Sequence, residues 1–138
     1  MDFKDKIVLI TGASSGIGKE TAIQFAKKGS NVILVARRKH KLEQIADDLK
    51  KLNISTLVCE CDVSDKSQVE KMSKLVLEKY GSIDILVNNA GFAIHGSVFD
   101  LTTEEIESQM ATNYFGMIYC IKNFLPSMLE KKSGHIAD

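Results

Sequence analysis

Short apolar runs alternate along the chain with stretches in which apolar residues recur every three or four positions. The short runs are rich in β-branched residues, as in strands buried on both faces of a sheet, and comprise residues 7–10, 32–35, 56–59 and 83–87. The helically spaced stretches comprise residues 17–26, 42–49 and 69–80. This alternation predicts an α/β fold: a doubly wound parallel sheet with helices on both faces and right-handed crossovers.

Residues that stop or start helices agree with this division. Gly29 and Gly81 follow the first and third helical stretches and should end them. Residues 102–105, with the sequence TTEE, predict a capping box at the start of a fourth helix. Pro126 falls inside a helical pattern, where we expect a kink.

The stretch from residue 110 to residue 129 is more apolar than one packing partner requires. At 100° per residue, its apolar side chains cover more than half of the helix circumference, whereas a helix on one sheet needs a stripe of roughly 100°. We therefore expect a second packing partner, and association of two or more copies of the chain. The residues concerned are Met110, Tyr114, Phe115, Met117, Ile118, Tyr119, Ile121, Phe124, Leu125, Met128 and Leu129.

Composition limits the class of protein. The 138 residues suit one domain, and 44% hydrophobic with 26% charged residues is the balance of a globular chain. The 18 basic and 18 acidic residues cancel, which argues against nucleic-acid binding through bulk positive charge. With no apolar run of membrane-spanning length and no signal-like start, we expect a cytoplasmic protein without a membrane partner.

The cysteines and histidines show no metal-ligand spacing. Cys59, Cys61 and Cys120 are odd in number and match no disulfide framework, which favours reduced thiols. Cys59 and Cys61 lie two apart in a strand-like run and have no second pair of ligands, so we expect buried thiols and no metal.

The first strand and helix are joined by residues 11–18, with the sequence TGASSGIG. Gly12 suits the tight turn, Gly16 lets backbone approach a diphosphate, and Gly18 lets helix and strand pack closely. The helix start offers free N–H groups to phosphate oxygens. Between a strand and a helix, this pattern predicts dinucleotide binding. A triphosphatase loop is excluded, because Glu20 stands where Ser or Thr is required and Ala13 where glycine is required.

The end of the second strand predicts which dinucleotide binds. An NAD site usually has an acidic residue there, for the ribose hydroxyl, but this chain has Arg37 and Arg38 after Ala36. Guanidinium groups match phosphate oxygens, which favours NADP over NAD. The competing interpretation is a solvated basic loop, since the basic run continues through residues 39–41.

Polar residues also follow the third and fourth strands, where ligands gather on such sheets. Asp62 suits an adenine amine or the cap of the next helix, with Ser64 and Asp65 competing for the cap. Asn88 and Asn89 suit either a ligand or a tie between neighbouring loops.

Together these motifs resemble the short-chain dehydrogenase/reductase family over essentially the whole chain. The residues that carry the resemblance are the glycine motif of residues 11–18, Asp62-Val63, the NNAG sequence of residues 88–91 and Asn113. The resemblance implies a Rossmann fold and NADP(H)-dependent hydride transfer between a carbonyl and an alcohol. It implies that Gly12, Ser14, Ser15, Gly16, Ile17 and Gly18 bind the diphosphate. Asp62 and Val63 would hold the adenine, and Asn89, Ala90 and Gly91 the nicotinamide ribose. Arg37 matches the basic position that marks NADP-preferring members, and Arg38 is the second expected cofactor-binding arginine. Asn113 matches the family's asparagine that holds a water in the proton relay.

The chain departs from the family in its catalytic residues. The family's Ser and its Tyr-x-x-x-Lys pair follow a strand that here should begin near residues 134–136. Tyr114 and Tyr119 are followed four residues later by Ile118 and Asn123. Residues 1–138 therefore look like the amino-terminal portion of a reductase, a single NAD(P)-binding domain incomplete at its carboxyl end after about four strands. The alternative is a dinucleotide-binding module that does not catalyse.

Overall fold

The computed structural model describes all residues of the chain, Met1–Asp138. Five parallel strands form one sheet in the order β3-β2-β1-β4-β5. The strands are β1 (Ile7–Thr11), β2 (Asn31–Ala36), β3 (Thr56–Glu60), β4 (Ile85–Val87) and β5 (His135–Ala137). The helices are α1 (Gly16–Lys27), α2 (Lys39–Leu49), α3 (Lys66–Tyr80), α4 (Thr103–Met110) and α5 (Met117–Lys131), with a 3₁₀ turn at Lys50–Leu52. The predicted doubly wound α/β fold is confirmed.

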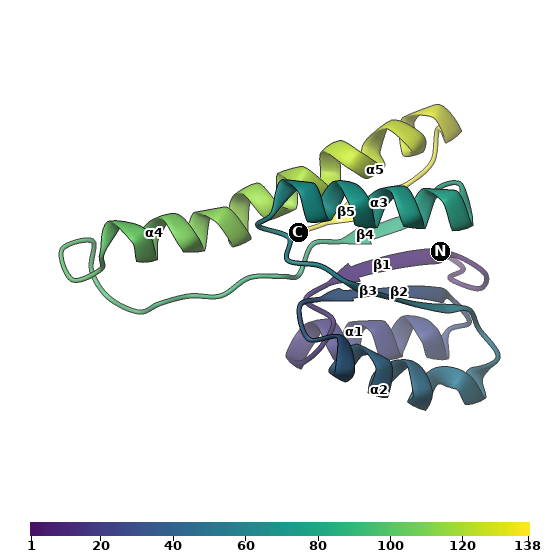
Figure 1. The fold of residues 1–138 in the computed structure, drawn as a ribbon. Coiled ribbons are helices and arrows are strands. Elements are labelled where there is room, and N and C mark those ends of the chain that lie inside the picture. Colours follow the sequence, from purple (N-terminus) through teal and green to yellow (C-terminus); the bar gives the residue numbers. More distant parts are fainter.

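Alternate residues of each strand supply two separate cores. Val8 and Ile10 of β1 face α1 and α2, whereas Leu9 between them faces α3 and α5, and all three are fully buried. Figure 1 shows α1 and α2 on one side of the sheet and α3 and α5 on the other. Because both faces are covered, the central strands are continuously apolar, which is the pattern from which they were predicted.

The predicted helix boundaries agree closely with the structure. Gly29 and Gly81 follow α1 and α3 with φ of 86° and 79°, in the left-handed region that glycine enters without strain. The capping box also forms, because the Thr102 side chain accepts from the Glu105 N–H at 3.1 Å and the Glu105 carboxylate accepts from the Thr102 N–H at 2.9 Å.

The long helical region after residue 102 contains a feature that the sequence did not predict. A π-helical segment, Ala111–Gly116, joins α4 to α5. Each π turn contains more residues than an α turn. The apolar arc predicted for residues 110–129 assumed a constant 100° per residue, and this does not hold across the π segment. Pro126 lies inside α5, which continues to Lys131, so the proline does not end the helix and the kink there stays a prediction.

The strand expected near residue 134 forms as β5 and pairs in parallel with β4. It covers the edge of β4 that faces away from β1. The exposed sheet edge on this side therefore belongs to β5, whose residues His135 and Ala137 are exposed. None of the helices is long and apolar enough to cross a membrane.

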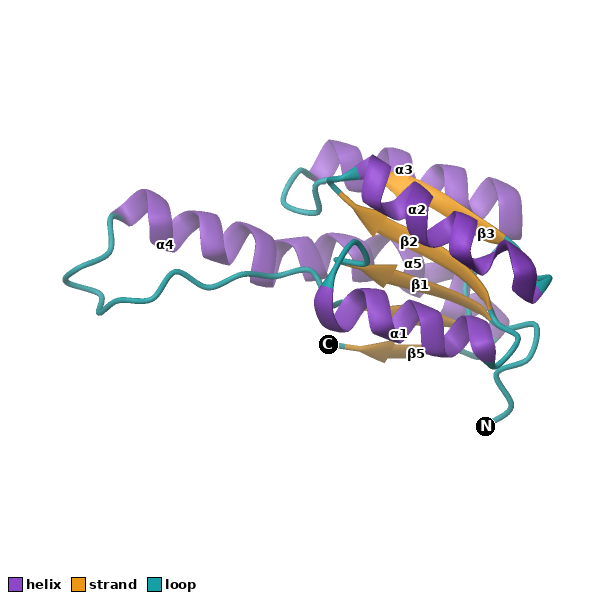
Figure 2. Ribbon diagram, turned by 90° about the horizontal axis from the view of Figure 1, so that it is seen from below, coloured by secondary structure: helices purple, strands orange, loops and turns teal.

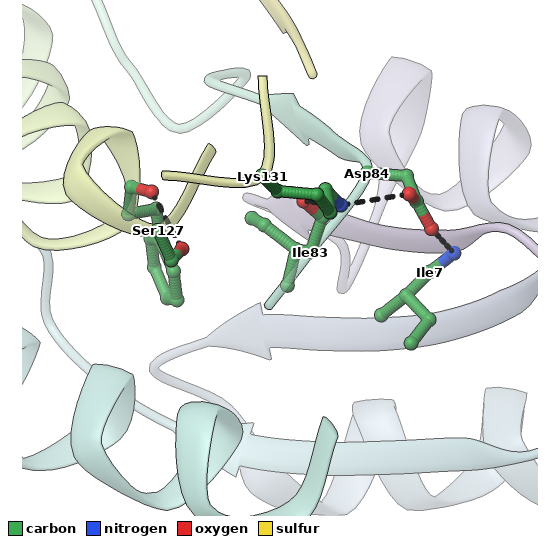
Figure 3. Close-up of polar contacts among 6 residues, drawn as sticks. Ile7, Ile83, Asp84, Ser127 and Lys131 are labelled. Atoms are coloured by element: carbon green, nitrogen blue, oxygen red, sulfur yellow. Dashed lines mark hydrogen bonds and ion pairs between the residues drawn. The ribbon is translucent and has the colours of Figure 1, made fainter. Parts of the chain in front are cut away.

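A polar cluster fastens the amino ends of the strands to the end of α5 (Figure 3). The Asp84 carboxylate accepts from the Ile7 N–H at 2.8 Å and from Lys131 Nζ at 2.9 Å, and Lys131 Nζ also donates to the Ile83 carbonyl at 3.2 Å. Burial alone raises the pKa of Asp84, but the bonds from Ile7 and Lys131, with the nearby Lys6, outweigh it and lower the pKa. One carboxylate thus joins β1 and α5 to the start of β4.

Candidate functional site

The predicted site residues meet at the carboxyl ends of the strands. The chain passes from β1 outward to β2 and β3, then crosses back to place β4 on the other side of β1. This reversal of direction is the point at which doubly wound sheets bind ligands. A cavity of about 530 Å³ lies there and is lined by all the predicted cofactor-binding residues except Gly18: Gly12, Ser14, Ser15, Gly16, Ile17, Arg37, Arg38, Asp62, Val63, Asn89, Ala90 and Gly91.

The glycine loop, residues 11–18, is closely packed at Gly18 and open at Gly16. A side chain at Gly18 would collide with the Gly12 carbonyl, so Gly18 is a packing residue and does not line the cavity. At Gly16 the φ is +56° and an added Cβ would meet nothing within 4 Å. Backbone at Gly16 therefore faces open space at the start of α1. The Ser15 side chain makes no capping bond there, which leaves the first N–H groups of the helix free to bind an anion.

The two arginines after β2 behave differently. Arg38 Nη2 donates to Ser14 Oγ at 3.1 Å and to Ser15 Oγ at 3.3 Å, which holds its guanidinium against the glycine loop. Arg37 lines the same cavity. The first turn of α2 contains no acidic residue, so this end of the cavity is cationic. Both arginines line the cavity, as the predicted cofactor site requires, and the sequence did not indicate that Ser14 and Ser15 would orient Arg38.

The structure assigns the cap of α3 to Asp65, and the adenine contact of Asp62 stays a prediction. Asp65 caps α3, because its carboxylate accepts from the Gln68 N–H at 3.2 Å. Asp62 instead accepts from the N–H and hydroxyl of Ser64, at 3.0 and 2.7 Å, and lines the cavity. Local bonds therefore hold the Asp62 carboxylate at the site.

The paired asparagines tie loops together. Asn89 Nδ2 donates to the Gly12 carbonyl at 3.3 Å, while Thr11 Oγ1 accepts from the N–H groups of Asn89 and Ala90, both at 3.0 Å. Asn88 Nδ2 donates to Asp138 at 2.8 Å, and its Oδ1 is buried without a partner. Asn89 also lines the cavity, and its contact with a ligand stays a prediction.

Asn113 lies in the π-helical segment beside the cavity and does not line it. Its amide forms two bonds with one residue: Nδ2 donates to the Phe92 carbonyl at 2.7 Å, and Oδ1 accepts from the Phe92 N–H at 2.9 Å. A Cβ at Gly91 would lie 2.9 Å from Asn113 Oδ1, so a larger residue there would force the Asn113 amide to shift. The amide therefore fixes the chain after Gly91, and the water-holding role implied by the resemblance stays a prediction.

Several lining residues were missed from the sequence: Val35, Ala36, Cys61, Phe92 and Thr112. All but Val35 adjoin a predicted site residue, so sequence neighbourhood was the available signal. Burial raises the pKa of the Cys61 thiol to about 12, with a smaller contribution from Asp62. Burial also raises the pKa of Cys59 to about 11 and that of Cys120 to about 12. All three thiols are free and buried, and no group of three or more His, Cys, Asp or Glu residues is arranged to hold a metal ion.

The comparison with known proteins identifies the family of the chain. The family model for short chain dehydrogenases matches residues 6–138. The chain belongs to the short-chain dehydrogenase family. It is 38% identical over 136 residues to an uncharacterized oxidoreductase of Listeria monocytogenes, covering 99% of this chain and 55% of the relative. It is 40% identical to a dehydrogenase/reductase SDR family protein 7-like of Anopheles gambiae, covering 95% of this chain and 43% of the relative.

Solved structures of the family have the same arrangement. An alcohol dehydrogenase from Thermococcus sibiricus, complexed with 5-hydroxy-NADP, superposes with a TM-score of 0.91 and 34% identity, covering 95% of this chain and 57% of the other. The L-sorbose reductase of Gluconobacter frateurii, complexed with NADPH and L-sorbose, gives 0.93 and 31%, covering 99% and 53%. An NAD⁺-bound xylitol dehydrogenase gives 0.92 and 26%, covering 99% and 53%. This family chain thus spans about half the length of the relatives it matches.

Proposed function

We propose that residues 1–138 form the nucleotide-binding part of an NADP(H)-dependent oxidoreductase that transfers hydride between a small-molecule carbonyl and an alcohol. The observation that carries the proposal is the cationic end of the cavity, where Ser14 and Ser15 orient the Arg38 guanidinium beside the glycine loop. Relatives of both cofactor types have this fold, because the solved structures include NADP, NADPH and NAD⁺ complexes. The choice of NADP therefore rests on the arginines.

The residues of the cavity fit a dinucleotide phosphate. The open backbone face at Gly16 and the free N–H groups of α1 would receive the diphosphate. Arg38, pre-oriented by the two serines, would receive the ribose 2′-phosphate, with Arg37 beside it. Asp62 and Val63 would hold the adenine, and Asn89, Ala90 and Gly91 the nicotinamide ribose. The bound cofactor supplies the hydride, and these residues supply its position and electrostatic surroundings.

Titration calorimetry on residues 1–138 with NADPH and NADH tests this assignment. We expect NADPH to bind more tightly, and Arg38→Ala to lower NADPH affinity roughly tenfold or more, since a hydrogen bond to a charged group contributes about 1.5–3 kcal/mol. Arg37→Ala should show a smaller loss, because Arg37 is not held in place by the serines. Lys39→Ala is the matched control: it removes one neighbouring positive charge, paired with Glu43 at 3.8 Å, outside the cavity. Equal affinities for the two cofactors would overturn the proposal of NADP.

The second candidate function is dinucleotide binding without catalysis by residues 1–138. Reduction of a carbonyl needs a proton donor for the developing alkoxide, and general acid catalysis contributes about 10²–10⁴ in rate. The ionisable groups lining the cavity are Arg37, Arg38, Cys61 and Asp62, and burial raises the pKa of Cys61 to about 12. No tyrosine among residues 1–138 has a lysine four positions later.

We therefore expect residues 1–138 to bind NADPH but not to oxidise it above background with ketones, aldehydes or quinones. The absorbance of NADPH at fixed protein concentration measures this directly. Saturable turnover that Asn113→Ala abolishes would contradict the expectation and would assign the proton transfer to residues within this chain.

We also propose that the chain associates with a second copy through the helical region α4–α5. Tyr114 and Phe115 of the π segment are each 47% exposed, and Leu129 of α5 is 66% exposed. Exposed apolar side chains gathered on one helical region favour association.

A further inference from the structure

The segment after Gly91 runs beside the helix that it later enters. Figures 1 and 2 both show the chain leaving β4, following α4 outward and turning back at the start of that helix. Side-chain amides of the helix reach this segment at two places. Asn113 pairs with the N–H and carbonyl of Phe92, and Gln109 Oε1 accepts from the Ile94 N–H at 3.0 Å.

These contacts form a ladder because two structural repeats match. Gln109 near the end of α4 and Asn113 in the π segment are four residues apart, about one helical turn. Phe92 and Ile94 are two residues apart, which is about 6.6 Å in an extended chain, and their N–H groups point to the same side. The two amides therefore meet every second residue of the antiparallel segment.

Gln109 is itself oriented by the helix. Its Nε2 donates to the Glu105 carbonyl one turn earlier at 3.2 Å, which directs its Oε1 toward the segment. Glu105 cannot add a further rung, because its carboxylate closes the capping box on Thr102. The ladder thus has two rungs and ends where the helix begins.

Burial does little to hold this segment in place. Phe92 is 41% exposed, and every other residue from 91 to 100 is exposed except the half-buried Ile94. The segment adjoins the cavity, because Gly91 and Phe92 line its wall on the β4 side. The side-chain amides are therefore the main polar restraint on one wall of the site.

We propose that Gln109 is a positioning residue of the dinucleotide site, acting with Asn113 to hold residues 92–94 extended so that Gly91 and Phe92 form the cavity wall. This inference rests on the proposed function. The arginines and Asp62 lie at the β2–β3 end of the cavity, where the adenosine phosphate is assigned, whereas Phe92 lies at the β4 end. Gln109 should consequently affect binding of the nicotinamide half and not of the adenosine half.

Two ligands and two variants distinguish an effect on binding of the nicotinamide half from an effect on the adenosine half. Gln109→Met keeps the length of the side chain but removes its acceptor, and Gln24→Met is the matched control. The Gln24 side chain bonds only to Glu20, at 2.6 Å, on the exposed surface of α1. Calorimetry is run with NADPH and with 2′,5′-ADP, which lacks the nicotinamide half. We expect Gln109→Met to weaken NADPH about fivefold, as for loss of one hydrogen bond, and to leave 2′,5′-ADP unchanged.

A second readout does not depend on a ligand. Hydrogen exchange measured by NMR should show a faster Ile94 amide in Gln109→Met, while the Phe92 amide, held by Asn113, stays protected. Gln109→Glu keeps an acceptor for Ile94 but loses the donor to the Glu105 carbonyl, so it should restore only part of the protection of the Ile94 amide. Partial recovery distinguishes the hydrogen bond from general loss of structure.

The outcomes are distinguishable. Unchanged NADPH affinity in Gln109→Met, or an equal loss for both ligands, overturns the positioning role while leaving the proposed function standing. Wild-type protein that binds neither ligand overturns the proposed function and, with it, the role of Gln109 in binding. An Ile94 amide that exchanges equally fast in wild type and Gln109→Met overturns the ladder itself.

Discussion

The central strands and the region after β4 are both rich in apolar residues, but they use them differently. In β1 and β2, Val8, Leu9, Ile10, Val32 and Ile33 are all 0% exposed. After β4, Val98 is 83% exposed and Phe99 is 96% exposed. An apolar pattern therefore shows that a segment has a face to bury, and the partner that buries it has to be found in the structure.

The helices show the same contrast. Helix α3 lies on the sheet and buries Val69, Met72 and Val76, whereas α4 buries none of its residues. Figure 1 shows why: α3 and α5 lie over the strands, while α4 extends beyond them. The two regions are held by different forces, with hydrophobic burial dominant over the sheet and polar contacts dominant along α4.

The largest effect on stability is expected when one phenylalanine is replaced in each region. Phe124 of α5 is 0% exposed, and Phe99 is 96% exposed. We expect Phe124→Ala to lower the free energy of unfolding by about 3–5 kcal/mol, because it removes a buried ring and leaves a cavity. Phe99→Ala should change it by less than about 0.5 kcal/mol. Urea denaturation followed by circular dichroism measures both, and equal effects would contradict the contrast.

An intermediate effect is expected on self-association. If the exposed side chains of the π segment contact a second copy, Phe115→Lys should shift the protein toward monomer, since it places a charge in an apolar contact. Phe99→Lys is the control, because it adds the same charge to the loop outside the helical region. Light scattering at micromolar concentration measures the mass of each. Wild-type protein that is monodisperse and monomeric would contradict the proposal.

The smallest effect concerns the polar cluster at the amino ends of the strands. Because the folded-state pKa of Asp84 is lowered, its stabilising contribution is present above the unfolded-state value of about 3.9 and is lost as pH falls through the lower folded-state pKa. Asp84→Asn should lower the free energy of unfolding by about 1 kcal/mol near neutral pH, because hydrogen bonds to the carboxylate are lost at a partly exposed site. The difference in free energy of unfolding between Asp84→Asn and wild type should shrink below about pH 3.9.

The control for this measurement is Asp47→Asn. Asp47 pairs with Lys50 at 3.0 Å, and its side chain is 68% exposed, so its loss should change stability by less than about 0.5 kcal/mol. Denaturation curves across pH measure both variants. A pH-independent difference between Asp84→Asn and wild type would show that the Asp84 carboxylate does not make this contribution.

Features encoded by neighbouring residues were predictable. Strands and helices follow from the spacing of apolar residues, and the starts of helices follow from residues such as Thr102 and Glu105, which bond across three positions. The glycines of residues 11–18 predicted the turn at the end of β1. The resemblance carried by the short motifs then identified the family, which the family comparison confirmed.

The tertiary structure decided the contacts between residues distant in sequence. It selected Arg38 over Arg37 as the arginine held by Ser14 and Ser15, across 24 and 23 positions. It also joined Gln109 to Ile94 across 15 positions. Apolar spacing reports only which residues share a face of their own element. Which faces meet depends on the order of the strands and on the change of helical phase at the π segment. These pairings therefore become visible only when the elements are packed together.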